Sequence, residues 1–387
     1  MIKRQLSGYI LDLKKKFPII SVSGPRQSGK TTLIRSLFKN YKYINLENPD
    51  ERFEVQEDIT GFLNRYAGDG LVIDEAQNIP EIFSYLQPFV DNSGEMGKIV
   101  LSGSQNFLLM ERITQTLAGR AGMVNLFPFT LEELKTTKYW SDDIYDFMLS
   151  GFYPALYDRG IEPAQYYPGY IQSYIERDVR SLKNIGNLNT FHRFLQLAAG
   201  RIGQILNYSS IANDLGMDHK TVKAWISILE ASYIIFLLNP HYKNFNKRVI
   251  KQPKLYFYDT GLAAALLRIR SKDALYLSHL RGSLFENFII AEYHKSMFHS
   301  GLQPDAFYFR DKSGNEVDMI IDRPPNLFPV EIKSGETVTK DFFKGLVKYQ
   351  VLSGALPEHS FLVYSGSKSV KRKYAHLLSW KEMEALK

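Results

Sequence analysis

A glycine-rich stretch at residues 24–31, Gly-Pro-Arg-Gln-Ser-Gly-Lys-Thr, has the spacing of a phosphate-binding loop. Gly24, Gly29, Lys30 and Thr31 fit the spacing G-x-x-x-x-G-K-[ST]. The glycines allow backbone conformations that direct successive N–H groups at a polyphosphate. This spacing predicts that Lys30 contacts the β- and γ-phosphates and that the Thr31 hydroxyl binds Mg²⁺.

The flanking residues favour the same chemistry. An apolar run at residues 17–22 precedes the stretch and an amphipathic segment follows from Thr32, so we expect strand, loop and helix in that order. An accidental match in a glycine-rich turn would not require this context. We therefore predict ATP binding by Gly24, Pro25, Arg26, Gln27, Ser28, Gly29, Lys30, Thr31 and Thr32.

A pair of acids ends a second apolar run. Asp74 and Glu75 follow residues 71–73, Leu-Val-Ile. We expect Asp74 to complete the Mg²⁺ shell and Glu75 to orient and polarise the attacking water. Two solvated acids at a strand end are the alternative.

Two further positions could assist hydrolysis. Ser104 or Gln105, after the next predicted strand, would sense the γ-phosphate or form a plain turn. Arg120 would stabilise charge that develops on phosphate, or would be an ordinary surface arginine.

Strand patterns and helical patterns alternate along the first third of the chain. Apolar strand patterns at residues 17–22, 41–46, 71–73, 98–104 and 123–127 are separated by helical patterns, which predicts a parallel sheet covered on both faces. The chain has 387 residues, more than one hydrophobic core usually serves. We predict a P-loop domain at residues 1–130, a helical lid or linker at 131–200, and two further domains.

Composition narrows the class of protein. The net charge of +7 suits an anionic partner, and the absence of cysteine excludes disulfides and thiolate metal sites. The N-terminus lacks an apolar signal core, and the longest apolar stretch, residues 231–238, is too short to span a bilayer. We expect a cytoplasmic protein with no membrane partner.

Residues 201–270 carry a helix-turn-helix pattern. A short helix at residues 208–216 and a second at 218–230 are followed by two apolar runs, 233–238 and 254–258, which predict a β-wing. The second helix offers His219, Lys220, Thr221 and Lys223 to DNA, and the predicted wing offers Lys247 and Arg248 among other bases. Service as a protein interface alone is the alternative.

In residues 271–387, acidic residues fall inside predicted strands and a predicted helix that are otherwise apolar. Asp318 and Glu331 fall in predicted strands, Lys333 shares a face with Glu331, and Glu286 lies in an apolar helix. Because buried carboxylates are costly without a partner, these residues predict a site for a second Mg²⁺ or Mn²⁺, with Glu286, Asp318 and Glu331 as ligands. Asp318, Glu331 and Lys333 would be the catalytic set for phosphodiester hydrolysis. A structural ion-pair cluster is the alternative.

Taken together, these motifs resemble the AAA-type P-loop ATPases of the archaeal-ATPase-like group that end in a domain of unknown function. The resemblance also rests on Leu-Ala-Gly-Arg, Tyr-Ile-Glu-Arg-Asp-Val, Phe-Tyr-Asp-Thr-Gly-Leu and Glu-Val-Asp through Val-Glu-Ile-Lys. It implies an α/β multidomain protein: a parallel sheet of the additional-strand class, a helical lid, a winged helix-turn-helix, and a C-terminal fold like that of PD-(D/E)XK restriction nucleases. It also implies that Arg120 and residues 176–179 are not ordinary surface.

Two hypotheses about function remain open. In the first, an Mg²⁺-dependent ATPase is coupled to binding or processing of duplex or branched DNA, with a possible nuclease at the C-terminus. In the second, ATP gates a signalling or scaffold protein whose last two domains bind protein without cleavage. Either could act as a homo-oligomer.

Overall fold

The computed structural model describes residues 2–103, 116–179, 187–241 and 251–387. The chain divides into two compact units. Unit 1 contains Met1–Phe129, Ala231–Tyr233 and Phe298–Leu302, and unit 2 contains Thr130–Glu230, Ile234–Met297 and Gln303–Lys387. Among the residues described, no helix is long and apolar enough to cross a membrane.

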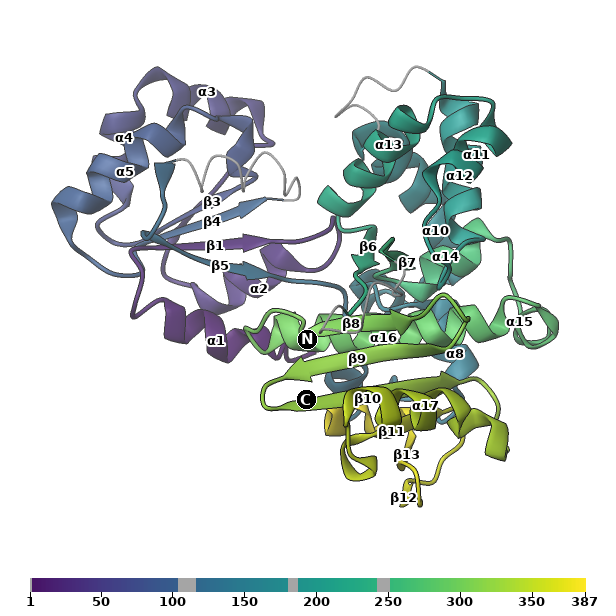
Figure 1. Cartoon of the computed structure of the whole chain (residues 1–387). Helices are drawn as coiled ribbons and strands as arrows, with labels where there is room; N and C mark the ends of the chain where they lie inside the picture. The colour runs from purple at the N-terminus through teal and green to yellow at the C-terminus, as the bar shows by residue number, and fades with distance from the viewer. Residues whose placement is uncertain (1, 104–115, 180–186, 242–250) are drawn as a thin grey trace. The chain divides into compact units, whose positions relative to one another are not determined.

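Unit 1 is built on a five-stranded parallel sheet (Figure 1). Its strands are β1 (Ile19–Ser23), β2 (Lys42–Asn45), β3 (Leu71–Asp74), β4 (Ile99–Gly103) and β5 (Ala121–Asn125), in the order β2-β3-β4-β1-β5. β4 therefore lies between β1, which leads into the glycine-rich loop, and β3, which ends in Asp74. The predicted parallel sheet is confirmed, and β4 is its additional strand.

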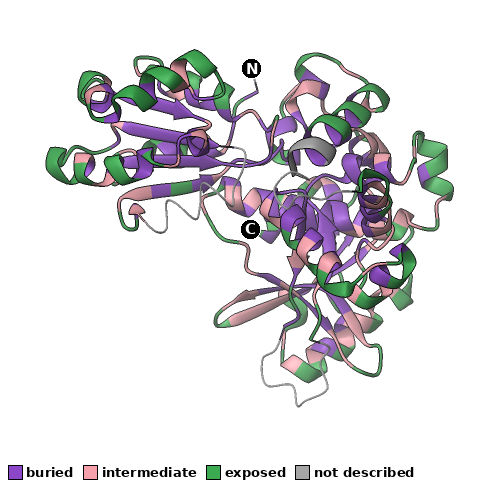
Figure 2. Cartoon of the chain, turned by 90° about the horizontal axis from the view of Figure 1, so that it is seen from above, coloured by how far each residue is buried: buried purple, intermediate pink, exposed green. Residues whose placement is uncertain are grey.

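Helices cover both faces of this sheet, and β1, β3 and β4 are accordingly buried at every residue. The helices are α1 (Leu6–Leu13), α2 (Lys30–Leu37), α3 (Pro49–Glu57), α4 (Ile59–Tyr66) and α5 (Ile82–Ser93). One core joins α1 and α2 to Ile20, Val72 and Val100. The other joins α3, α4 and α5 to their strand neighbours, including Ile73 and Leu101. Figure 2 shows the strands as a buried layer inside exposed helices.

Unit 2 begins with short helices. They are α7 (Leu131–Leu134), α8 (Ile144–Ser150), α9 (Pro154–Asp158), α10 (Pro163–Tyr170), the π-helical continuation Ile171–Val179 and α11 (Leu188–Ala199). The predicted change from alternating strands and helices to helices is confirmed. Tyr153, Tyr166, Tyr167 and Tyr170 form a buried aromatic cluster here.

The next elements follow the predicted order of two helices and a hairpin. α12 (Tyr208–Leu215) ends at Gly216, which has a left-handed φ of 66°, and α13 (His219–Ala231) starts three residues later. β6 (Ile235–Leu238) and β7 (Lys254–Phe257) then pair antiparallel. Two short helices follow, α14 (Thr260–Leu266) and α15 (Lys272–Leu277).

The last third forms a six-stranded mixed sheet. Its strands are β8 (Ala306–Arg310), β9 (Glu316–Arg323), β10 (Asn326–Lys333), β11 (Phe361–Tyr364), β12 (Val370–Lys371) and β13 (His376–Ser379), in the order β12-β13-β11-β10-β9-β8. β10 runs antiparallel to β9 and parallel to β11. The long helix α16 (Arg281–His299) precedes the sheet, α17 (Lys344–Ser353) connects β10 to β11, and the turn helix Trp380–Leu386 ends the chain.

Candidate functional site

The glycine-rich loop turns at the carboxyl end of β1. Gly24 and Gly29 have φ angles of 148° and 93°, which side chains disfavour. A Cβ atom on Gly24 would lie 2.1 Å from the carbonyl oxygen of Leu126, so the close approach of two backbone segments also requires glycine there. Gln27, inside the loop, has a positive φ of 62° without being glycine. Thr32, the last predicted nucleotide-binding residue, is exposed on α2.

Lys30 begins α2 and is folded back onto the loop. Its Nζ donates to the carbonyl oxygens of Gly24 and Pro25, each at 2.9 Å, and the residue is 6% exposed. Burial lowers the pKa of Lys30, and the charges of Glu75 and Asp74 oppose that shift. The ammonium therefore occupies the loop next to the two acids.

Asp74 is surrounded by hydroxyl groups from three other elements. Its Oδ2 accepts from Thr31 Oγ1 at 2.7 Å and from Tyr43 OH at 2.5 Å, and its Oδ1 accepts from Ser102. The donors come from α2, β2 and β4, which meet because the carboxyl ends of parallel strands lie at one edge of the sheet. Thr31 and Asp74, each predicted separately as an Mg²⁺ ligand, are thus in direct contact.

Glu75 has a left-handed backbone, with φ 54°. Such a conformation is uncommon for residues other than glycine and recurs at functional sites. Gln77 Nε2 donates to Glu75 Oε2 at 2.5 Å, which orients the carboxylate. Arg26, on the loop, pairs with Glu47 at 3.0 Å.

Arg120 is the predicted site residue that the structure keeps away from the loop. It precedes β5, at the amino edge of the parallel sheet, whereas the loop follows β1 at the carboxyl edge. Its Nε and Nη2 contact the two carboxylate oxygens of Asp91 at 2.6 and 2.8 Å. The prediction that Arg120 stabilises phosphate charge is therefore wrong for a loop in the same chain.

Three residues near the loop carried no motif and were missed. Tyr43 and Ser102 bind Asp74, and Arg4 donates to the Ser28 carbonyl oxygen at 2.8 Å. Ser102 belongs to a polar strand end that the sequence shows, but Tyr43 and Arg4 lack any local signal. Several predicted residues lie outside the described residues or have undescribed side chains: Ser104, Gln105, Glu176, Arg177, Asp178, Arg180, Lys247 and Arg248.

Asp318, Glu331 and Lys333 meet in the C-terminal sheet. Lys333 Nζ lies 3.4 Å from Asp318 Oδ2 and 2.5 Å from Glu331 Oε1. Asp318 Oδ2 also accepts from the Ile332 backbone N–H at 2.7 Å. Burial, and then the charge of Asp318, raise the pKa of Glu331, while Lys333 opposes that shift. The two acids thus lie on one face of the sheet, beside Lys333.

Glu286 faces a lysine and a tyrosine of the hairpin. Lys254, the first residue of β7, lies 3.1 Å from Glu286 Oε1 and 2.5 Å from Glu316 Oε1. Tyr256 OH donates to Glu286 Oε1 at 2.5 Å. Burial alone would lower the pKa of Lys254, but Glu286, Tyr256 and Glu316 raise it well above its usual value. Glu286 was predicted to bind a metal cation. In the structure, the buried ammonium of Lys254 occupies that place beside Glu286.

The acid set does not fit a divalent cation in this arrangement. No group of three or more His, Asp or Glu among the residues described is arranged to hold a metal ion. Lys254 and Lys333 already compensate the carboxylates of Glu286, Glu316, Asp318 and Glu331. The ion-pair interpretation of these acids is the one that the contacts favour.

Basic side chains lie on one exposed surface of the helix pair α12 and α13. His219, Lys220 and Lys223 of α13 are exposed, while Val222, Trp225 and Ile226 of the same helix are buried. The Lys220 backbone N–H donates to Asp218 at 2.9 Å, which fixes the first turn of the helix. This is the face that could reach a phosphate backbone.

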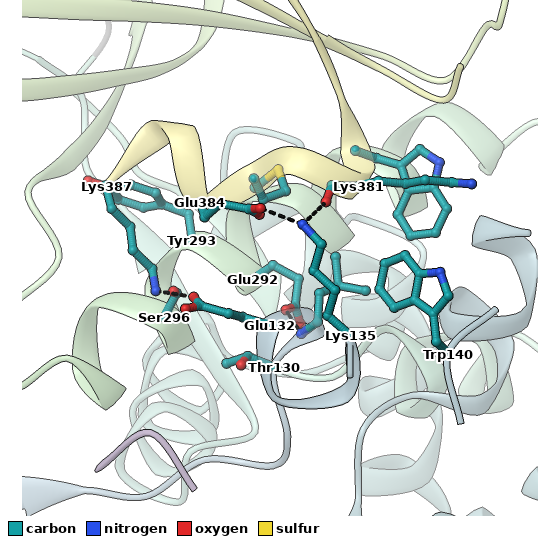
Figure 3. A pocket seen from close by; sticks show the side chains of 13 residues that line it. Thr130, Glu132, Lys135, Trp140, Glu292, Tyr293, Ser296, Lys381, Glu384 and Lys387 are labelled. Atoms are coloured by element: carbon teal, nitrogen blue, oxygen red, sulfur yellow. Dashed lines mark hydrogen bonds and ion pairs between the residues drawn. The ribbon is translucent and has the colours of Figure 1, made fainter. Parts of the chain in front are cut away.

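A small cavity near the C-terminus is not a second site. It encloses about 20 Å³ and is rimmed by two ion pairs, Lys135 with Glu384 and Lys387 with Glu132 (Figure 3). That volume suits about one water molecule and no nucleotide. The ion pairs join α7 and the residue after it to the turn helix Trp380–Leu386 and the residue after that helix.

Known families match three successive parts of the chain. Residues 16–135 match a model described as an AAA domain. This part of the chain is therefore similar to AAA domains, and the match supports a P-loop fold for it. Residues 141–273 match a domain of unknown function, DUF8612, and residues 281–383 match another, DUF4143.

Relatives extend over most of the chain. It is 27% identical over 353 residues to "Uncharacterized protein Rv2008c" of Mycobacterium tuberculosis, which covers 89% of this chain and 78% of the relative. It is 23% identical over 411 residues to "Uncharacterized protein MJ1637" of Methanocaldococcus jannaschii, covering 92% and 83%. The solved Walker-type ATPase PABY2304 of Pyrococcus abyssi is 17% identical, with a TM-score of 0.41 and coverage of 69% of this chain and 96% of that one.

Proposed function

We propose that the chain is an Mg²⁺-dependent ATP hydrolase whose site is built from Lys30, Thr31, Asp74 and Glu75. One observation carries the proposal: the Thr31 hydroxyl, directly after the loop lysine, donates to Asp74 at the end of β3. A hydroxyl and a carboxylate brought together beside a phosphate loop are the donor set that holds Mg²⁺ in this class of site. The AAA domain match over residues 16–135 supports it.

The residues present fit Mg²⁺ with a nucleotide. Oxygen donors from Thr31 and Asp74 suit a hard cation, and Tyr43 and Ser102 hold the carboxylate in place. When bound, Mg²⁺ would neutralise the charge that develops on the phosphates.

The chain's own residues supply the remaining steps. Lys30 exchanges the carbonyl oxygens of Gly24 and Pro25 for phosphate oxygens. The exchange is favourable because the two carbonyl oxygens are neutral acceptors and the phosphate oxygens are charged. The loop N–H groups take the other phosphate oxygens. Glu75, held by Gln77, orients the attacking water and accepts its proton.

ATP turnover tests the proposal. Lys30→Ala should abolish ATP binding or hydrolysis, because it removes the loop's cation. Lys39→Ala, an exposed lysine just beyond α2, is the matched control and should turn over ATP like the parent. Equal nucleotide affinity in the parent and Lys30→Ala would refute the assignment.

We further propose that α13 and the β6–β7 hairpin bind duplex or branched DNA through phosphates. The support is the exposed base set His219, Lys220 and Lys223 on the second of two helices in helix-turn-helix order. Neutralising Lys220, Lys223, Lys247 and Arg248 together should weaken DNA binding and flatten its salt dependence. Unchanged binding at every salt concentration would favour the alternative, an ATP-gated signalling or scaffold protein.

Cleavage of phosphodiesters by the C-terminal residues stays a prediction. Asp318, Glu331 and Lys333 share one face, but their contacts do not fit a metal ion, so no catalytic step follows from them. Nicking of DNA with Mg²⁺ or Mn²⁺ by the parent, lost in Asp318→Asn with ATP turnover intact, would establish it. If the parent does not nick DNA, the structural ion-pair cluster remains the explanation for Asp318, Glu331 and Lys333.

A role for Arg120 would need another copy of the chain. We propose that any contribution of Arg120 to hydrolysis comes in trans within a homo-oligomer, because the residue lies at the opposite sheet edge from its own loop. Mixing Arg120→Ala chains with Lys30→Ala chains is the test. ATP turnover restored in the mixture requires an assembly in which one chain supplies Arg120 to another. A mixture that stays inactive gives no support to a role of Arg120 in trans.

A further inference from the structure

A buried arginine joins the segment before α1 to the glycine-rich loop. Arg4 is 6% exposed. Its Nη1 donates to the carbonyl oxygen of Ser28 at 2.8 Å, and its Nη2 donates to the carbonyl oxygen of Phe127 at 2.5 Å. The guanidinium carbon also lies 4.8 Å from the ring centroid of Phe129. These contacts fix the side chain from three directions within unit 1.

The contact with Ser28 determines where a loop N–H group points. A trans peptide is planar, and its C=O and N–H point in opposite directions. When Arg4 holds the Ser28 carbonyl, the Gly29 N–H of the same peptide must point away from Arg4. Gly29 caps the amino end of α2, where an N–H group can contact a phosphate.

Lys30 orients loop peptides in the same way, but only until a nucleotide arrives. It holds the carbonyls of Gly24 and Pro25, and it must release them to contact phosphate oxygens. Arg4 contacts the carbonyls of Ser28 and Phe127 and has no such exchange to make. Neither contact has to be released for Lys30 to reach phosphate oxygens.

The second contact anchors Arg4 to the neighbouring strand connection. β5 pairs with β1, and the Leu126 N–H donates to the Ser23 carbonyl at 2.8 Å, so the segments after the two strands lie side by side. The fork of the guanidinium spans them with one donor on each. A lysine has a single ammonium on a flexible stem and does not reproduce that planar fork.

We propose that Arg4 is a positioning residue for nucleotide binding, which holds the Ser28–Gly29 peptide with its N–H toward the phosphates. The inference rests on the proposed ATPase function. It assigns a role to the segment before α1, which no motif marks.

The test measures the dissociation constant of a fluorescent ATP analogue with Mg²⁺, the KM and kcat for ATP, and the melting temperature without nucleotide. Arg4→Met removes the fork, Arg4→Lys keeps the charge, and Lys3→Met is the matched control at an exposed neighbour. Arg4→Met should bind the analogue about tenfold more weakly, the effect expected when one charge-assisted hydrogen bond no longer orients the loop. Arg4→Lys should fall between Arg4→Met and the parent, and Lys3→Met should match the parent.

The outcomes separate positioning from folding. A lower melting temperature in Arg4→Met with unchanged affinity and KM would overturn the inference, because a purely structural role predicts that pattern. If Arg4→Met does not fold, Arg4→Lys decides: affinity equal to the parent overturns the inference, and a weaker affinity in a fully folded variant supports it. A parent that binds no ATP refutes the ATPase proposal itself, which is a different result from equal binding by parent and variant.

Discussion

Replacing Lys254 by methionine should destabilise unit 2 strongly. The side chain is 1% exposed and its ammonium contacts both Glu286 and Glu316. Methionine keeps a similar length and apolar stem but removes the charge. Two partly buried carboxylates, with side chains 15% and 24% exposed, then lose their shared cation, and each is better solvated by water than by the protein without one.

The size of the loss in unfolding free energy depends on the contacts that Glu286 and Glu316 keep in Lys254→Met. Breaking a buried ion pair by removing one partner typically costs about 3–5 kcal/mol. Here Tyr256 still donates to Glu286, and Arg310 Nη1 still contacts Glu316 Oε2 at 2.8 Å. We therefore expect about 3 kcal/mol, near the lower end of that range. Glu286→Gln added to Lys254→Met should recover part of the loss, because it removes one unpaired charge.

Tryptophan fluorescence during urea denaturation is the assay. Trp140, Trp225 and Trp380 are the three tryptophans of the chain, and all belong to unit 2. Their signal therefore reports the unfolding of that unit, and nucleotide binding reports unit 1 separately.

Lys272→Met is the matched control for this prediction. Lys272 also pairs with two carboxylates, Asp143 at 2.6 Å and Asp146 at 2.7 Å, but its side chain is 46% exposed. Exposed pairs contribute at most about 1 kcal/mol. Equal losses from Lys254→Met and Lys272→Met would refute the argument that burial makes the Lys254 contacts strong.

Three further predictions concern single side chains. Tyr43→Phe should raise the Mg²⁺ concentration for half-maximal ATP turnover about fivefold, since one hydrogen bond of about 1 kcal/mol no longer holds Asp74; an unchanged Mg²⁺ requirement would contradict this. Burial raises the pKa of Glu230 to about 7, so the parent loses stability as the pH rises from 4.5 through 7. Glu230→Gln carries no such charge and should therefore be more stable than the parent above pH 7 by about 1–2 kcal/mol. That difference should vanish below pH 4.5 in thermal melts, and a constant difference would count against it. Asp259→Ala should cost about 3 kcal/mol in tryptophan-monitored unfolding, since Phe152 N, Leu262 N and Tyr167 OH all lose their acceptor; a loss below about 1 kcal/mol would show that other acceptors replace it.

The candidate nucleotide site of unit 1 could be predicted because its signals are local. Lys30 and Thr31 belong to one motif, and Asp74 and Glu75 end one apolar strand. Parallel strands bring such ends to one edge, so the pairing of Thr31 with Asp74 follows from topology. The same reasoning applied to Arg120 would have placed it correctly, because a residue just before a strand lies at the other edge.

The contacts that sequence reasoning missed join distant residues of different elements. Arg4 contacts a carbonyl 123 residues away, and Lys254 contacts Glu286 across 32 residues. Glu286 was recognised as an acid in an apolar helix, but the pattern could not show which cation would meet it. Apolar periodicity shows where a charge is buried, and only tertiary packing determines its partner.

The most direct test of the central claim compares ATP binding with ATP hydrolysis in Glu75→Gln. Glutamine keeps the shape of the side chain and cannot accept a proton, while the loop and Asp74 are unchanged. We predict parental affinity for Mg²⁺·ATP together with turnover reduced at least about a hundredfold, the usual contribution of a positioned base. Parental turnover in Glu75→Gln would contradict the account of this site.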